Sequence, residues 1–315
     1  MAEAASRLAK KKLPLYKQRG FRLFLLILPF VLLVLALNYF PLYHWKNVFY
    51  RYKPGLTMTS EHFVGFGNFV NLFTNKYQVE ELVAVLTNTL ALSGLNILAL
   101  PIPMAFAILL SELRMKRFRK SVQTLTTIPN FISWAMVYAV AYTIFSPGDG
   151  FLNRLLTSVG AIDKGIDFLA SPNHVWLVQM AWNLWKSLGW NAIMYFASIS
   201  SIDSELYEAA QADGAGRFAR IWHITIPGLM PTLFVMFVLN ISNFVNYGLE
   251  QPLVFQNVFN LKRIQTLDLY VYNQGIAGFS AANAMIVGVF KSIVSVALMV
   301  CANSFSKLIR KESVI

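Results

Sequence analysis

Uncharged apolar runs limit what this chain can fold into more than any other feature. Residues 23–43 form a run of 21 residues without a charge. At about 1.5 Å per residue, a helix of this length crosses a bilayer core of about 30 Å. A second uncharged run covers residues 82–110, where Pro101 and Pro103 are expected to kink the helix. Runs of this length predict an all-α membrane protein.

Four more apolar stretches bring the expected number of transmembrane helices to six. The third is expected at about residues 121–147, where a Ser-Pro-Gly turn ends it. The fourth follows at about residues 175–200 and the fifth at about 232–249, and the sixth ends before Lys307. The expected organisation is a basic N-terminal segment at 1–22, a six-span transmembrane domain at 23–306 and a tail at 307–315.

The placement of Lys and Arg predicts the orientation of the spans. The N-terminal segment, residues 111–121, residues 201–231 and the C-terminal tail carry 17 of the 27 Lys and Arg residues, against 8 in the three alternate loops. Short cytoplasmic segments of membrane proteins are enriched in these residues. We therefore expect a multi-pass protein of the cell membrane with both termini and the 201–231 loop in the cytoplasm.

Charge and residue usage exclude several classes of function. A net charge of +12 would suit a nucleic-acid-binding protein, but the charges flank apolar runs instead of lining a soluble fold. One cysteine, Cys301, rules out an internal disulfide framework. The four histidines lack metal-ligand spacing, and no G-x-x-x-x-G-K-[ST] or G-x-S-x-G sequence occurs. We expect no catalytic site, no metal and no nucleic-acid partner.

The loop at residues 201–231 has a helix-turn-helix pattern. Asp203 or Ser204 is suited to cap a short alanine-rich helix, and Gly214 is suited to end it, because glycine adopts the left-handed conformation found after helix C-termini. A second helix with one apolar face follows, and Pro227 and Pro231 are expected to end it. Such a unit is small enough to dock into a cleft of another protein.

This loop resembles the EAA motif of permease subunits in ABC importers, which reads EAA, three residues, glycine, nine residues, then I-x-x-x-P or a close relative. Three residues separate Ala210 from Gly214, nine separate Gly214 from Ile224, and the proline comes slightly early, at Pro227. The resemblance assigns coupling to the ATPase to these residues: Glu208, Ala209, Ala210, Asp213, Gly214, Ala215, Arg217 and Pro227.

The resemblance extends over the rest of the chain. Residues 65–69 resemble a segment that often follows the first span in sugar permeases, and residues 266–272 and 288–292 look like the branch that handles oligosaccharides and polysaccharide fragments. It implies the six-span type I ABC importer permease fold, with the coupling loop between spans four and five. It also implies a second homologous permease subunit, two ATPase subunits that bind ATP and Mg, and an extracytoplasmic solute-binding protein. The chain itself would need no cofactor.

Polar residues inside the expected spans are candidates for the substrate path, since such groups are costly in lipid. The spacing of Asn240, Asn243, Tyr247 and Glu250 places them on one face if residues 232–249 continue as a helix. Aromatic rings beside amides and charges suit a sugar. The candidate path residues are Trp182, Asn183, Lys186, Asn191, Asn240, Asn243, Tyr247, Glu250, Asn283 and Lys291.

Other interpretations of these residues stay open from the sequence. The amides could join helices and either lysine could pair with Glu250, or Lys186 and Lys291 could form a positive patch that favours acidic saccharides. An ion-coupled secondary transporter would use the same charged residues as a relay, although we detect no internal repeat of the kind common in such transporters. A membrane scaffold would need no polar face in its spans.

Overall fold

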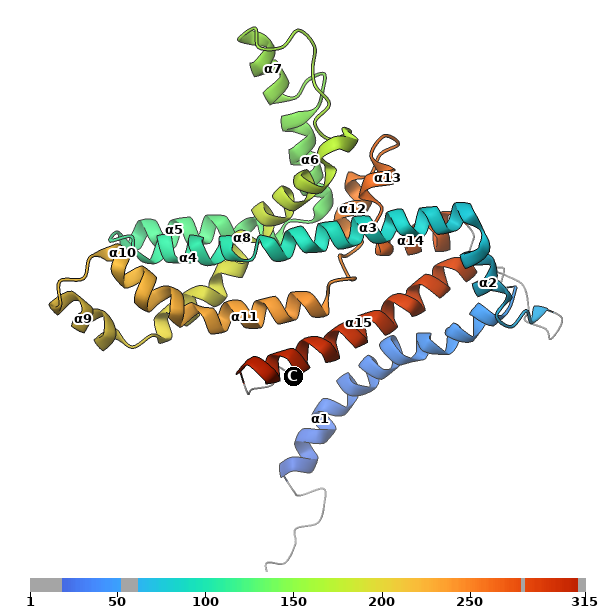
Figure 1. Ribbon diagram of the computed structural model, residues 1–315, viewed down its shortest axis with the longest axis horizontal. Helices are drawn as coiled ribbons and strands as arrows, with labels where there is room; N and C mark the ends of the chain where they lie inside the picture. The colour runs from blue at the N-terminus through green and yellow to red at the C-terminus, as the bar shows by residue number, and fades with distance from the viewer. Residues whose placement is uncertain (1–18, 52–61, 279–280, 311–315) are drawn as a thin grey trace, which may run out of the picture.

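The computed structural model describes residues 19–51, 62–278 and 281–310, and these residues form helices joined by short connections (Figure 1). The basic segment 1–18 and residues 311–315 lie outside the described residues. The longer helices are α1 (Arg19–Val34), α3 (Lys76–Leu98), α4 (Pro101–Ser111), α5 (Lys116–Thr127), α6 (Trp134–Phe145), α8 (Val175–Ser201), α11 (Ile226–Ser242) and α15 (Ala281–Arg310). The shorter ones are α2 (Gly67–Thr74), α7 (Phe151–Ser158), α9 (Ser204–Ala212), α10 (Arg217–Arg220), α12 (Glu250–Phe255), α13 (Leu261–Ile264) and α14 (Leu267–Tyr272).

Among the described residues, four helical segments are long and apolar enough to cross a membrane, namely Leu23–Phe49, Lys76–Ser111, Arg217–Ser242 and Ala281–Ser304. The second contains α3 and α4, whose boundary at Pro101 is the interruption that the sequence predicted. The first extends beyond residue 43, and Asn68 closes its end by donating to the carbonyls of Val48 and Tyr50 at 2.7 and 2.9 Å.

The predicted third span at residues 121–147 is not one continuous helix. Residues Lys116–Phe131 and Trp134–Phe145 form a pair of helices bent by 107°. Pro129 lies at the break, where its ring removes a helix hydrogen bond, and the Ser133 hydroxyl then caps α6 by accepting from the backbone N–H of Met136 at 3.4 Å. The break leaves α6 and α7 projecting from the bundle (Figure 1).

The fifth span differs from its predicted bounds at both ends. Helix continues from Arg217 through Pro227 and Pro231 to Ser242, so neither proline ends the second helix of the EAA loop. In the π-helical turn at Ile221–Thr225, the N–H of Ile226 donates to the carbonyl of Ile221. Such local changes of helix type allow a helix to continue past prolines, here Pro227 and Pro231. The last helix also continues past Lys307 to Arg310, since nothing in residues 281–310 breaks it.

Helix α8 lies at the centre of the bundle and covers the predicted fourth span. It packs against α3, α4, α5 and α11, and its Ala192, Tyr195 and Phe196 belong to a buried cluster that α4 and α11 complete. Gly189 makes the contact with α5 possible, because a Cβ atom there would lie 2.4 Å from the carbonyl carbon and oxygen of Thr126. Small residues at such positions let helix backbones approach closely in membranes.

Candidate functional site

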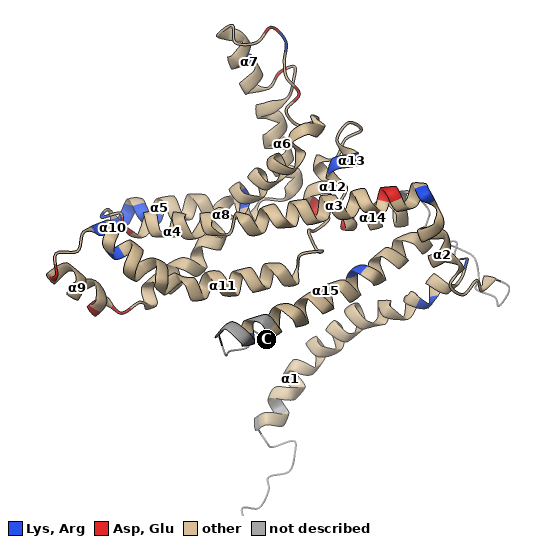
Figure 2. Cartoon of the chain, viewed as in Figure 1, with Lys and Arg blue, Asp and Glu red and all other residues tan. Residues whose placement is uncertain are grey.

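The EAA loop folds as its sequence predicted at its first helix and turn. The Asp203 carboxylate accepts from the backbone N–H of Glu205 at 3.0 Å and caps α9. Gly214 follows α9 with a φ of 79°, in the left-handed region that favours glycine. Figure 2 shows acidic residues on α9 and a group of basic residues on α5 and α10 at the same end of the molecule. The helices between the two ends are almost free of charge in the same view.

The loop is anchored to the bundle yet leaves large apolar side chains uncovered. The Tyr207 hydroxyl lies 3.0 Å from the Thr225 hydroxyl, and Arg217 lies 3.9 Å from the carboxylate of Glu112 at the end of α4. Phe218 is 89% exposed and Trp222 is 69% exposed. Such exposed aromatic side chains on a fixed surface are typical of a protein interface. Of the predicted coupling residues, Glu208, Ala209, Asp213, Gly214, Arg217 and Pro227 are exposed, and Ala210 and Ala215 are half-buried.

A small cavity brings three of the predicted path residues together. It has a volume of about 140 Å³ and lies where α3, α4, α8 and α11 meet. Four asparagines line it, Asn96, Asn183, Asn191 and Asn240, beside Ser187 and apolar side chains. We call it the amide cavity. Asn96 was not among the path residues predicted from the sequence. It lies inside the second uncharged run and so met the criterion that selected the others, a polar residue within an expected span.

A larger cavity shares Asn183 with the amide cavity. It has a volume of about 350 Å³ and is lined by Trp134, Asn183, Tyr247, Gly248, Leu249, Glu250 and Gln251. We call it the turn cavity. The Tyr247 hydroxyl donates to Gln251 at 3.2 Å, and the Gln251 amide donates to the Gln179 carbonyl of α8 at 2.8 Å. Aromatic rings, amides and a carboxylate thus border one space.

The prediction of a single helical face through Asn240, Asn243, Tyr247 and Glu250 is wrong. Helix α11 ends at Ser242, residues 243–249 form a turn, and Gly248 has a φ of 99°. The Asn240 and Asn243 amides both donate to carbonyls one turn back, contacts that compete with regular helix continuation. Tyr247 and Glu250 still line the turn cavity, whereas Asn243 is exposed and lines neither cavity.

The remaining candidates lie outside both cavities. Trp182 packs edge-on against Trp185 and Phe145 and lines a separate apolar cavity of about 690 Å³ between α6 and α8. Asn283, Lys186 and Lys291 line neither the amide cavity nor the turn cavity. Trp134 and Gln251 were not predicted from the sequence. The break before α6 places Trp134 at the turn cavity, and the turn after α11 places Gln251 there, and neither interruption was predicted.

The two lysines inside the spans have partners, and neither forms an ion pair with Glu250 in the described part of the chain. Lys186 is buried and donates to the carbonyls of Pro129 and Asn130 at 3.2 and 2.7 Å. Lys291 pairs with Asp268 of α14. The pairing with Glu250, one of the alternatives left open from the sequence, is therefore not found among the described residues, because Lys186 is bonded to carbonyls and Asp268 reaches Lys291 from the short helix α14.

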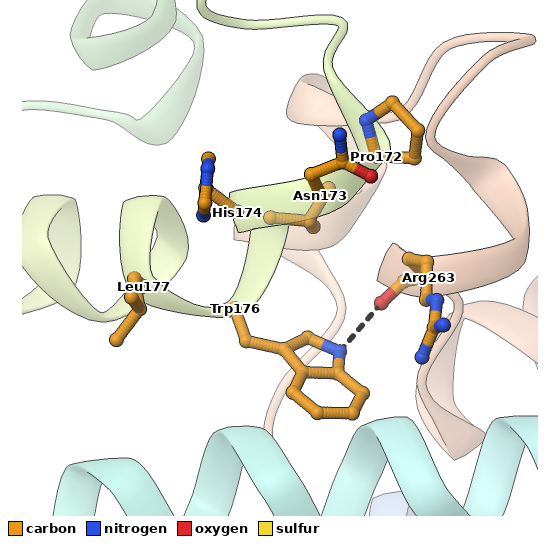
Figure 3. Close-up of a pocket in the computed structure, with 7 residues that line it drawn as sticks. Pro172, Asn173, His174, Trp176, Leu177 and Arg263 are labelled. Carbon is orange, nitrogen blue, oxygen red and sulfur yellow. Dashed lines mark hydrogen bonds between the residues drawn. The ribbon is translucent and has the colours of Figure 1, made fainter.

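A further cavity opens where α8 begins (Figure 3). It has a volume of about 440 Å³ and is lined by residues 172–177 and Arg263. The Trp176 indole donates to the Arg263 carbonyl at 2.9 Å, and the Arg263 guanidinium lies 5.6 Å from the ring centre. These contacts join α8 to α13, and no predicted path residue lies here.

Comparison with known families decides what kind of protein carries these features. Residues 99–312 match the family described as Binding-protein-dependent transport system inner membrane component. The chain belongs to this family of transport permeases. The match includes the EAA loop, the whole turn cavity and all of the amide cavity except Asn96, so the resemblance found in the sequence is confirmed.

Individual members of the permease family resemble the chain over nearly its whole length. Protein LplB of Bacillus subtilis (strain 168) is 34% identical over 291 residues, which cover 92% of this chain and 90% of that protein. The polygalacturonan/rhamnogalacturonan transport system permease protein YteP of the same organism is 33% identical over 293 residues, covering 93% and 89%. A solved chain from a bacterial alginate ABC transporter, in complex with an alginate pentasaccharide-bound periplasmic protein, matches with a TM-score of 0.82 and 30% identity, covering 94% of this chain and 97% of that one.

Proposed function

We propose that this permease is the membrane subunit of an ATP-driven importer that takes up oligosaccharides or polysaccharide fragments. The observation that carries the proposal is the exposed EAA loop on a chain whose relatives include permeases of polygalacturonan and alginate transporters. The turn cavity supports a sugar as cargo, because Trp134 offers an aromatic face and the amides and Glu250 offer partners for hydroxyl groups.

The proposed topology has six spans with both termini in the cytoplasm. Four of the six are the long apolar segments. The bent pair of residues 116–145 would be the fifth and α8 the sixth. Helix α8 then enters from the outer side and ends at the EAA loop, and the excess of Lys and Arg marks the loop's side as cytoplasmic. The inner membrane is the proposed location.

The proposed complex contains a second homologous permease, two ATPase subunits and an extracytoplasmic solute-binding protein. ATP and Mg would bind to the ATPase subunits, and the exposed Phe218 and Trp222 would help fill the ATPase interface around α9. Closure of the ATPases would rotate the two permeases and expose the path to alternate sides of the membrane. The role of this chain is to transmit that motion and to line half of the path.

Reconstitution tests the proposed function. The permease is placed in proteoliposomes with its partner subunits and with the binding protein loaded with uronate or neutral oligosaccharides. Uptake that requires ATP on the side of the membrane that carries the ATPase subunits supports the proposal. Uptake driven by a proton or sodium gradient without ATP would replace it with the ion-coupled mechanism.

State-dependent labelling tests the position of the path. In a Cys301→Ser background, Tyr247→Cys should react with a polar thiol reagent in one nucleotide state and be protected in the other, because Tyr247 lines the turn cavity. Asn243→Cys is the matched control four residues earlier, on the same turn but outside both cavities. Equal labelling of Tyr247→Cys in every state would show that the turn cavity is not part of the translocation path.

A further inference from the structure

Apart from Asn183 of α8, the turn cavity is lined by two walls that belong to different parts of the fold. Trp134, the first residue of α6, forms one wall directly after the break in the bent span. Residues 247–251 form the other, in the turn after α11 and the start of α12. Both walls follow interruptions of helical structure, so helix geometry alone does not fix their positions.

Lys186 holds the first wall. Its ammonium group is bonded to the carbonyls of Pro129 and Asn130, and it lies 5.5 Å from the centre of the Trp134 ring. A cation at the C-terminal end of a helical segment is stabilised by the helix dipole and by the carbonyls that lack helical partners. One buried side chain of α8 thus contacts both sides of the break.

Asp268 holds the second wall. One carboxylate oxygen accepts from the backbone N–H of Gly248 at 3.0 Å, and the other is paired with Lys291 of α15. The two side chains are only 20% and 14% exposed. Charged partners shielded in this way make strong and directional contacts. The turn is therefore tied to α14 and α15 at the residue between Tyr247 and Leu249.

We propose that Lys186 and the Asp268–Lys291 pair are positioning residues, each fixing one wall of the turn cavity, and that neither lysine contacts the sugar. The proposal rests on the proposed function only in taking the turn cavity as part of the path. It follows that a preference for acidic or neutral saccharides does not come from direct contact with these two ammonium groups, which are bonded to carbonyls and to Asp268.

Thiol labelling of the assembled, sugar-free complex in a Cys301→Ser background tests each wall separately. Ile132→Cys reports the Trp134 wall and Leu249→Cys reports the turn, and both side chains are half-buried against the same apolar cluster. Lys186→Met should speed labelling at residue 132 by about tenfold, the factor expected from losing a charge-assisted hydrogen bond, and leave residue 249 unchanged. Lys291→Met should speed labelling at residue 249 and leave residue 132 unchanged. Lys186→Arg and Lys291→Arg should restore the slow rates.

The outcomes separate positioning from the alternatives. Faster labelling at both cysteines in either variant would show a general loss of packing and would overturn the proposal. Unchanged labelling at both, with loss of uptake for a uronate oligosaccharide but not for a neutral one, would show that the lysines bind substrate and would also overturn it. Because labelling is measured without sugar or ATP, its result stands whatever the reconstituted complex transports.

Discussion

Replacing Gly189 by leucine should abolish the assembled complex. Any Cβ atom at this position would lie 2.4 Å from backbone atoms of Thr126 and 2.6 Å from the backbone nitrogen of Thr127. Backbone atoms cannot rotate away, so α8 and α5 would have to separate along their shared face. Overpacking of this kind lowers the free energy of unfolding by about 1–3 kcal/mol for the added atoms alone, and by more when whole helices have to move.

The amount of folded permease in detergent, measured by size-exclusion chromatography and thermal unfolding, checks the Gly189 prediction. Gly189→Ala should be intermediate. Gly94→Ala is the matched control, because Gly94 also lies within a long helix but nothing lies within 4 Å of a Cβ atom there. A Gly189→Leu protein that assembles and unfolds like the wild type would contradict the close α8–α5 contact.

Replacing Gly214 by tryptophan should uncouple ATP hydrolysis from uptake while leaving the permease in the membrane. Gly214 ends α9 with a left-handed backbone that side chains strain, and its exposed position leaves room for the indole to project toward an ATPase. Uptake should fall by about tenfold or more, as after loss of a central interface contact. The ratio of sugar imported to ATP hydrolysed is the quantity to measure.

Gly214→Ala separates backbone strain from bulk in the EAA loop. It has the same unfavourable φ as the tryptophan variant but adds only one methyl group, so most of the coupling should persist. Normal uptake by the Gly214→Trp protein would mean that the turn after α9 does not enter the ATPase cleft.

The EAA loop was predictable from the sequence because its first helix and turn depend on neighbouring residues. A carboxylate at Asp203 caps the helix that follows it, and glycine at 214 supplies a conformation that other residues avoid. The helix predicted at residues 175–200 and the interruption at Pro101 were also predictable, since each depends on a local run of residues. Family membership followed from the same local pattern.

The parts that failed depend on contacts between distant residues. The break at Pro129 is completed by Lys186, which is 56 residues away from Asn130, and Lys291 finds Asp268 across 23 residues. Hydropathy treats a bent span and a straight one alike, and Pro129 marks a possible break without giving the 107° angle between the two helices. The helical-face prediction failed for a different, local reason: it assumed a straight helix through Asn243, where side-chain bonds to the preceding turn and Gly248 end the helix.

The turn at residues 243–249 bears on how the cargo of such a permease can change over evolution or by design. Inserting one residue into α8 would rotate everything after it by about 100° and destroy the packing of the bundle. An insertion or deletion in the turn leaves α11 in register and alters only one wall of the cavity, and non-helical connections tolerate such length changes far better than packed helices do. With the turn cavity as the proposed sugar site, new substrates are most easily reached by varying the length and composition of this turn while the spans are left unchanged.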